Sequence, residues 1–500
     1  MRVRLLGLLA LAALALPAAA GAAADSQPVL VVGNNWDGTA DVVHPTTFRR
    51  IARLNIVPDL PARLAELQSN PANYAYFLAI REQVGEGHDQ FVDDAFTSND
   101  GRFLYVSRPS LVDVVGIDLA TQKIIWRVKV DGNRADHMAI SPDGKRLLVS
   151  ASTAKKVHVI DTAAGRIVGE FPSGDQPHEN NYSADGGLIY HASIGTVFTA
   201  LDAPEFDSTK GERIFELVDA RTLRVIKRLN MGQKLAEAGY PGMSSAVRPM
   251  ALSPDERFVY FQVSFFHGFV EYDLQQDRVT RLANLPLSQE ASQKRRDEYL
   301  LDSAHHGLAM NPQGTKLCAA GTVSDYAAIV SRTTFAAQII PVGPKPYWST
   351  NSGDGRHCFV SVSGADSVAV ISYATEELVA RFAVGDHPQR MRMGRLRYGL
   401  LGTVAPPPRI KPLLRVSVSP RRTVAGRRAA MRIRVTAFTN GRLRAVRGVR
   451  VSIGRAGTLT NRFGRATLRV RPGRSGVYRV RAGRGGYRFG FARFLAVRAR

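Results

Sequence analysis

Basic and phenolic side chains recur at about the same place in successive segments of this chain. They are His137, His178, Arg248, the pair His305-His306, Lys345 with Tyr347, and His387. Imidazole nitrogens and a carboxylate are donors that zinc and similar divalent metals prefer. If the fold brings these segments together, the sequence predicts a divalent-metal site. Its candidate ligands are His137, His178, Glu179, His305 and His306.

Two other interpretations of these residues remain open. The histidines could be polar groups that line a channel and bind water and backbone. Alternatively, Arg248 and Lys345 could bind a small anion together with protonated histidines. No His-x-x-x-His spacing favours the metal. The candidate ligand-binding residues beyond the metal set are Asn35, Trp36, Asp37, His88, Asp89, Arg248, Lys345, Tyr347 and His387.

Motifs of several enzyme classes are absent from the sequence. It contains no Cys-x-x-Cys-His, so no covalently attached c-type haem is expected. It also contains neither the Gly-x-Ser-x-Gly of a nucleophile elbow nor the Gly-x-x-x-x-Gly-Lys-Ser/Thr of a phosphate-binding loop. The sequence therefore identifies no catalytic residue.

The segments that carry these residues are copies of one internal repeat. A turn such as Ser141-Pro142-Asp143-Gly144 is followed 161 − 143 = 18 residues later by the end of a strand at Asp161, and the pairs Asp100/Asp118 and Asp255/Asp273 have the same spacing. Each copy predicts four short strands separated by Gly, Asp and Pro turns. A lone four-stranded sheet cannot bury both faces, so the copies should stack around an axis as a β-propeller.

Six complete copies are visible, and a seventh is divided between the two ends of the repeat region. Residues 30–32, 41–43 and 49–55 predict its outer strands, and 387–393 predict its innermost strand. The sequence therefore predicts an all-β protein, with a seven-bladed β-propeller over residues 28–400 that is closed by this shared blade. Residues 60–82 should be helical, with Asp59 as N-cap, and could act as a lid.

The repeat resembles the YVTN-repeat, YncE-like family of seven-bladed propellers. The resemblance rests on Gly174-Asp175-Gln176-Pro177-His178, on Ser141 to Val149, and on Val159-Ile160-Asp161-Thr162. The family includes binding proteins, lactonase-like enzymes and subunits of redox enzymes. The resemblance therefore implies the fold and leaves the chemistry open.

The start of the chain predicts export. A charged start, an apolar run from Leu5 to Leu16 and small residues near Ala24 are typical of a secretory signal peptide over residues 1–24. An uncleaved anchor is the alternative, and no later stretch is apolar and long enough to span a membrane. The two cysteines, Cys318 and Cys358, lie on equivalent strands of adjacent copies, so they could form a disulfide or remain buried thiols.

The end of the chain is strongly cationic. After Asp386 there is no Asp or Glu, whereas residues 387–500 contain 30 of the 67 Lys and Arg residues, and the formal net charge of the chain is +24. A Pro-rich linker over residues 401–411 precedes alternating apolar and arginine positions over 412–500. This pattern predicts a small antiparallel β-sandwich covered by guanidinium groups. Residues 458–468 resemble a strand-turn-strand of bacterial Ig-like or carboxypeptidase-regulatory-like domains.

The arginines have two interpretations. They could form a solvated face in a protein encoded with arginine-rich codons, or they could bind an anionic polymer of the cell surface. We favour the polymer because codon usage does not explain the loss of every acid, and nucleic acid is the least expected target. The sequence thus predicts a protein that is secreted and either free or associated with the cell wall. Its propeller mouth binds a small molecule or a protein partner; the alternative is a metal-dependent hydrolase, a lactonase-like enzyme or an oxidoreductase subunit.

Overall fold

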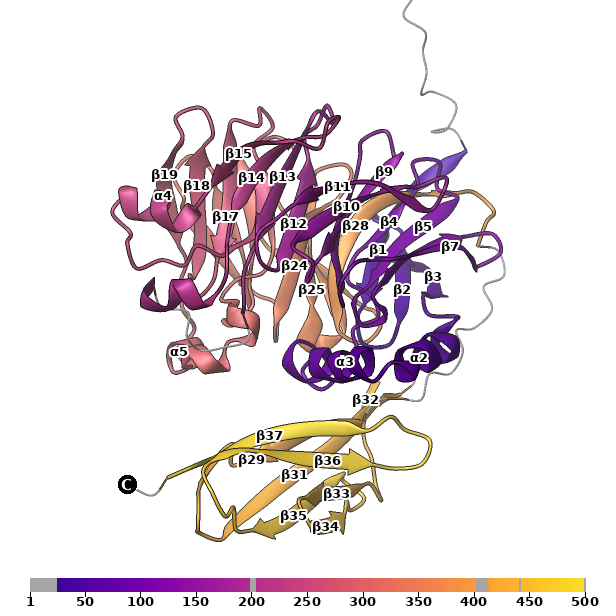
Figure 1. The fold of residues 1–500 in the computed structure, drawn as a ribbon, viewed down its shortest axis with the longest axis vertical. Helices are drawn as coiled ribbons and strands as arrows, with labels where there is room; N and C mark the ends of the chain where they lie inside the picture. Colours follow the sequence, from indigo (N-terminus) through magenta and orange to yellow (C-terminus); the bar gives the residue numbers. More distant parts are fainter. Residues whose placement is uncertain (1–24, 198–203, 402–411, 413, 440–441, 499–500) are drawn as a thin grey trace, which may run out of the picture.

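The computed structural model describes residues 25–197, 204–401, 412, 414–439 and 442–498. The predicted signal peptide and nearly all of the predicted linker lie outside these residues. Between Ser26 and Arg397 the described residues form seven four-stranded antiparallel sheets. This repetition of one four-stranded unit fits a β-propeller (Figure 1).

Each sheet is a run of four strands that pair in order. The sheets are β4(Ala95–Thr97), β5(Phe103–Arg108), β6(Asp113–Asp118), β7(Lys123–Lys129); β8(Ala135–Ile140), β9(Arg146–Ala151), β10(Lys156–Asp161), β11(Arg166–Pro172); β12(Pro177–Tyr182), β13(Leu188–Ser193), β14(Phe215–Asp219), β15(Val225–Leu229); β16(Val247–Leu252), β17(Phe258–Val263), β18(Gly268–Asp273), β19(Arg278–Asn284); β20(Leu308–Met310), β21(Lys316–Gly321), β22(Tyr326–Ser331), β23(Ala337–Pro341); and β24(Pro346–Asn351), β25(His357–Val362), β26(Ser367–Ser372), β27(Leu378–Ala383). The seventh sheet has the order β28(Pro388–Arg397), β1(Ser26–Asn34), β2(Thr39–Val43), β3(Arg50–Asn55). The predicted division of one sheet between the two ends of the repeat region is therefore confirmed.

The first strands of successive sheets contact one another in sequence order. β4 contacts β8, β8 contacts β12, and the series continues through β16, β20 and β24 to β28. β28 in turn contacts β4, so the series closes on itself. Residues far apart in the chain therefore meet at the strands that open each sheet, as the repeat predicted.

The Ser-Pro-Asp-Gly turn is stabilised by its own side chains. Ser141 Oγ donates to Asp143 Oδ1 at 2.6 Å, and the Lys145 amide donates to the same oxygen at 3.0 Å. Gly144 has a φ of 74°, a left-handed conformation that glycine adopts without a steric penalty. The Ser183-Asp185, Ser253-Asp255 and Ser352-Asp354 pairs repeat the first contact.

Helices occur in the long loops between and within the sheets. They are α2(Leu60–Ser69), α3(Pro71–Gln83), α4(Met231–Glu237) and α5(Gln289–Ser292), with short 3-10 helices at Pro109–Leu111, Pro204–Thr209, Arg296–Glu298, Leu300–Asp302 and Ser363–Ala365. The predicted helical segment is divided into α2 and α3 at Asn70, and Asp59 occupies the N-cap position of α2 as predicted. Asp59 makes no side-chain cap bond because its carboxylate accepts from Arg108 instead. None of the described helices has the length and apolar character needed to cross a membrane.

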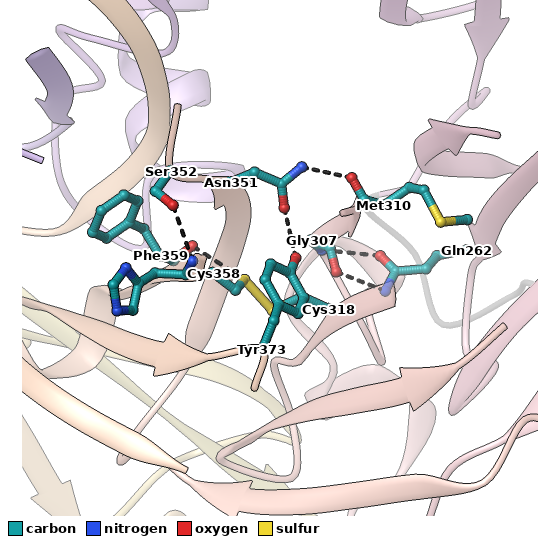
Figure 2. Close-up of a disulfide and its surroundings, with 10 residues drawn as sticks. Gln262, Gly307, Met310, Cys318, Asn351, Ser352, Cys358, Phe359 and Tyr373 are labelled. Atoms are coloured by element: carbon teal, nitrogen blue, oxygen red, sulfur yellow. Dashed lines mark hydrogen bonds between the residues drawn. A yellow bond between two sulfur atoms is a disulfide. The ribbon is translucent and has the colours of Figure 1, made fainter. Parts of the chain in front are cut away.

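The two cysteines form a disulfide between neighbouring sheets (Figure 2). Cys318 lies on β21 and Cys358 on β25, and both are fully buried. Around them pack the apolar side chains Ala327, Ile329, Val360 and Ile371. The bond therefore links two units of the ring through their shared apolar layer.

The C-terminal residues form two sheets around a separate apolar core. One contains β29(Leu414–Ser419), β31(Ala429–Thr439), β32(Arg442–Ala445) and β35(Arg465–Val470), and the other contains β30(Arg422–Val424), β37(Gly490–Val497), β36(Gly476–Gly483), β33(Arg450–Ile453) and β34(Ala456–Leu459). We call residues 414–498 the sandwich. The prediction of a purely antiparallel module is wrong at one edge, because β30 pairs with β37 in parallel.

Candidate functional site

Irregular pairing at the start of the innermost strands lets adjacent side chains reach the same place. The register of β8 shifts between Ala135 and Met138, and that of β12 shifts between Pro177 and Asn180. A bulge of this kind interrupts the strict alternation of side chains along a strand. Asp136 and His137 therefore both line the central cavity, and His178 and Glu179 both contribute to the cluster around it.

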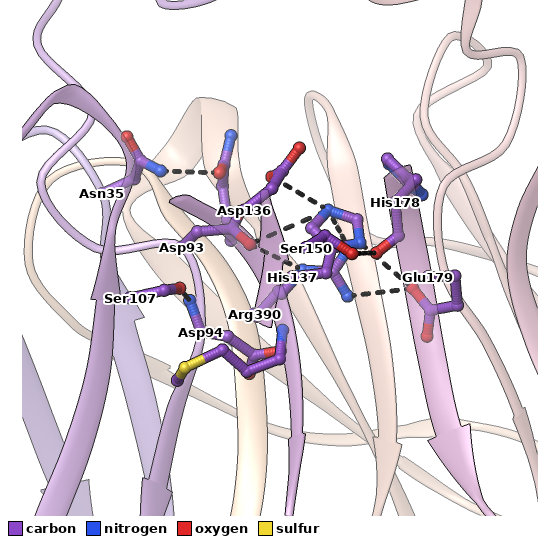
Figure 3. A network of polar contacts seen from close by, with 12 residues as sticks. Asn35, Asp93, Asp94, Ser107, Asp136, His137, Ser150, His178, Glu179 and Arg390 are labelled. Atoms are coloured by element: carbon purple, nitrogen blue, oxygen red, sulfur yellow. Dashed lines mark hydrogen bonds and ion pairs between the residues drawn. The ribbon is translucent and has the colours of Figure 1, made fainter. Parts of the chain in front are cut away.

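His137 lies at the centre of a buried polar cluster (Figure 3). Its Nδ1 is 3.2 Å from Glu179 Oε2, and its Nε2 is 3.6 Å from Asp136 Oδ1 and 3.7 Å from Asp93 Oδ2. The His137 and His178 ring centroids are 3.7 Å apart. Two predicted metal ligands from neighbouring sheets thus meet, and Glu179 joins them.

Arg390, on β28, supplies a positive charge inside this cluster. Its side chain is fully buried, contacts both ring nitrogens of His137, and lies 3.4 Å from Asp93 and 3.5 Å from Glu179. Its guanidinium also stacks over Trp348 at 3.9 Å from the ring centroid. The strand His387 to Met393 was predicted to be innermost, but Arg390 was not predicted to belong to the site.

Burial sets the protonation of the cluster. It raises the pKa of Asp93 to about 7 and raises that of Glu179, while the Arg390 guanidinium opposes both shifts. Burial, reinforced by Arg390, lowers the pKa of His137 well below its ordinary value. Burial likewise lowers the pKa of His178 and His306, and these shifts favour neutral imidazoles over the protonated ones that the predicted anion site needs.

The cavity beside the cluster is small and polar. Space for about one water molecule, roughly 20 Å³, remains among its lining residues. Its lining includes the polar side chains of Asp93, Arg134, His178, Arg248, His306 and Tyr347. His178 Nδ1 and His306 Nδ1 are buried there without a hydrogen-bond partner among the described residues. The His306 ring stacks on Tyr347 at 4.2 Å.

Two predicted site residues lie elsewhere. His305 does not join the metal candidates, and its Nε2 lies 3.2 Å from the Tyr326 hydroxyl. Of the two adjacent histidines, His306 lines the cavity and His305 does not. Lys345 is also outside the cavity, where its ammonium pairs with both oxygens of Glu86 at 2.6 Å.

The remaining predicted residues form a second group over the cavity. The Trp36 ring lies between two parallel imidazoles, with centroid distances of 3.6 Å to His88 and 3.7 Å to His387. Asn35 Nδ2 donates to Gln389 Oε1 at 2.7 Å. Asp37 accepts from the Asp386 amide at 2.9 Å, and burial raises the pKa of Asp37 to about 7.

The sandwich covers this second group. Arg488 Nη2 donates to the Trp36 carbonyl at 2.8 Å, and Arg488 lies 3.4 Å from Asp89. Arg415 lies over the Trp36 ring at 5.5 Å from its centroid. Trp36, His88 and His387 are each less than a tenth exposed, so they are not open to a large partner in this arrangement.

Sequence reasoning missed four charged residues of the cluster: Asp93, Arg134, Asp136 and Arg390. Asp136 directly precedes His137, and in a regular strand adjacent side chains point to opposite faces, so it was not expected beside His137. Asp93 ends a long loop that carries no repeat signal. Only Arg390 could have been found from the sequence. It lies within His387 to Met393, which was expected to be an innermost strand, and a charged side chain on such a strand can face the cavity.

The arrangement can hold an ion or a water-sized ligand. One donor atom each from His137, His178 and Glu179, or from Asp93, Asp136 and His137, lies within 4.8 Å of the others. Nitrogen and carboxylate donors suit a divalent transition metal. Arg390 opposes such an ion because it already places a positive charge against His137.

Comparison with known proteins identifies no family. No family model matches the chain, and no curated protein matches it. Among solved structures, the chain is similar to "Kuenenia stuttgartiensis Hydrazine Synthase" with 17% identity and a TM-score of 0.47, over 67% of this chain and 90% of that one. A likeness of this degree carries no argument about activity.

Proposed function

We propose that this chain is an exported binding protein, in which a seven-bladed, YVTN-like propeller carries an Ig-like sandwich that attaches it to an anionic cell-surface polymer. The propeller contributes a polar cavity for an ion or a water-sized ligand. The sandwich contributes an exposed arginine face. The pairing of arginines on its two sheets is the observation that carries the proposal.

Each sheet of the sandwich places two arginines directly opposite each other. On one sheet Arg479 pairs with Arg493 across β36 and β37, and both contact Glu82 of the propeller, at 3.3 and 2.9 Å. On the other sheet Arg434 pairs with Arg465 across β31 and β35. Among the described residues no ion pair joins Arg434 or Arg465 to a carboxylate, and both side chains are exposed.

Like charges opposite each other destabilise a sheet unless an opposite charge lies between them. Glu82 provides that charge on the first sheet. On the second sheet a phosphate or carboxylate of a polymer would play the same part, and Arg432 and Arg469 flank the pair on the same two strands. Guanidinium groups bind such oxygens through two parallel hydrogen bonds.

We expect the protein to bind a phosphate-rich polymer such as polyphosphate at low salt and to lose this binding as salt rises. Replacing Arg434 and Arg465 together by alanine should weaken binding at least tenfold, because each arginine contributes a charge-assisted contact. Fluorescence anisotropy with a labelled polymer measures the change. The matched control replaces Arg146 and Arg166 of the propeller, which are exposed arginines outside the sandwich. Binding that ignores salt, or equal loss in both variants, would contradict the proposal.

A second candidate function is a metal-dependent hydrolase, a lactonase-like enzyme or an oxidoreductase subunit. The convergence of His137, His178 and Glu179 at the cavity favours it. A metal bound there would supply Lewis-acid chemistry, while Asp93 would hold or release a proton beside it.

If this second function holds, purified mature protein should bind one cobalt(II) ion per chain with the visible absorption of a nitrogen-ligated site. His178→Ala should abolish that absorption, since His178 Nδ1 is a buried donor without another partner among the described residues. His305→Ala is the matched control, because His305 is equally buried but lies outside the cluster. Wild-type protein that shows no cobalt absorption would count against this function while leaving the binding function in place.

A further inference from the structure

Four arginines of the sandwich meet four carboxylates on one face of the propeller. Two of the arginines lie near the centre of the contact: Arg415 pairs with Asp366 at 3.1 Å and with Asp386, and Arg488 pairs with Asp89. Arg479 and Arg493 lie at its rim and share Glu82. The sandwich, which contains no Asp or Glu, therefore forms ion pairs with carboxylates of the propeller of the same chain.

The site of Arg415 is a pocket suited to a guanidinium group. Asp366 and Asp386 lie close enough to repel each other, and this repulsion together with burial raises the pKa of Asp366 to about 6, which Arg415 opposes. The Trp36 ring, whose faces are covered by the two imidazoles, lies beside the pocket with its centroid 5.5 Å from the Arg415 guanidinium carbon. Two neighbouring carboxylates bind a guanidinium group through charge-assisted hydrogen bonds.

The pocket lies beside residues that connect with the cavity. Asn35, next to Trp36 in the chain, donates to Gln389, which lines the cavity. Gln90, two residues after His88, lines it as well. The sandwich therefore covers residues that are close neighbours, along the chain, of the cavity lining.

We propose that the propeller carries a guanidinium-binding pocket formed by Asp366 and Asp386 beside Trp36, that Arg415 fills it in cis, and that the sandwich is a detachable cover of the cavity. The rim arginines keep 53% and 39% of their side chains exposed, so salt and polyanions reach them directly. A polymer that competes for these arginines opens the cover. This last step rests on the proposed polymer binding, whereas the pocket and the cover do not.

The test uses the full chain with a protease site placed in residues 402–411, cleaved after folding. At about 50 mM salt the two halves should elute together in size-exclusion chromatography, and about 1 M salt should separate them because the contact is made by charge pairs. Replacing Arg415 and Arg488 together by alanine should raise the dissociation constant of the halves at least tenfold. Free arginine amide at millimolar concentration should also promote separation by competing for the pocket.

The control variant replaces Arg434 and Arg465, which are exposed and form no ion pair with the propeller among the described residues, and its halves should stay together like those of the wild type. Wild-type halves that separate at low salt, or that stay together at 1 M salt and in the Arg415/Arg488 variant, would overturn the cover. Release by polyphosphate in the wild type supports opening by a polymer. If salt separates the halves and polyphosphate does not, the opening step is wrong and the proposed polymer attachment is judged separately by its own binding assay.

Discussion

Replacing Arg390 by methionine should lower the free energy of unfolding by about 3–5 kcal/mol, as expected when one partner of a buried charge network is removed. Arg390 is fully buried between Asp93 and Glu179 and stacks on Trp348. Without it, two buried carboxylates lose the cation that stabilises their ionised form. Urea denaturation of wild type and variant measures the difference.

This loss should depend on pH. Burial raises the pKa of Asp93 in the folded protein to about 7, above the ordinary value of an aspartate, so protonation favours the folded state. Its contribution to stability is fully present below about pH 4 and is lost as pH rises towards 7. Removing the guanidinium raises this folded-state pKa further. The deficit of the variant should therefore be larger at pH 8 than at pH 5.

Two further variants make the Arg390 prediction specific. Combining Arg390→Met with Asp93→Asn and Glu179→Gln should restore part of the stability, because no buried charge is then left unpaired. Arg166→Ala, at an exposed position of β11, should change stability by less than about 0.5 kcal/mol. A deficit that is the same at both pH values and in the triple variant would show that lost packing, rather than charge, explains the effect.

The sequence contained most of the fold because the repeat is local. Turns such as Ser141 to Gly144 and the spacing to Asp161 depend on residues within one unit, so each copy indicates its own strands. The divided sheet was also predictable, since 387–393 resembles the other innermost strands. The parallel pairing of β30 with β37 was not, because Arg422 to Val424 is too short to carry a directional signal.

The site was predicted in part, and the errors have a common cause. The meeting of His137 with His178 followed from the repeat, but a register shift between Ala135 and Met138, which the sequence does not signal, brings Asp136 to the same cavity. Arg415 was correctly placed on an alternating strand. Its partners Asp366 and Asp386 could not be identified, because pairing between two modules depends on their relative placement rather than on local pattern.

Asp59 shows how a distant residue overrides a local motif. It stands before α2 as an N-cap would, yet its oxygens accept from Arg108 at 2.6 and 3.1 Å. Arg108 is fully buried, donates to both oxygens of Asp113 at 2.7 and 2.8 Å, and also reaches the Ile56 carbonyl. One side chain therefore fastens the start of the helical pair to the sheet of β5 and β6.

Arg108→Ala should accordingly lower the free energy of unfolding by about 3 kcal/mol, because the buried carboxylate of Asp113 loses its bidentate partner and keeps only Arg127, at 2.6 Å. Hydrogen exchange should also accelerate in α2 more than in β9, since the anchor at Asp59 is lost with the same side chain. Denaturation and exchange measured by mass spectrometry provide the two readouts.

Arg108→Lys is the matched variant for this anchor. Lysine keeps the charge but cannot bond both oxygens of Asp113 and reach Asp59 in the same plane, so it should recover less than half of the lost stability. Arg356, whose side chain is 81% exposed and lies 3.9 Å from Asp354, is the surface comparison, and Arg356→Ala should cost less than about 0.5 kcal/mol. Full recovery by lysine would mean that charge alone holds the helical pair, and an unchanged exchange rate in α2 would mean that Arg108 stabilises the sheet without anchoring the helices.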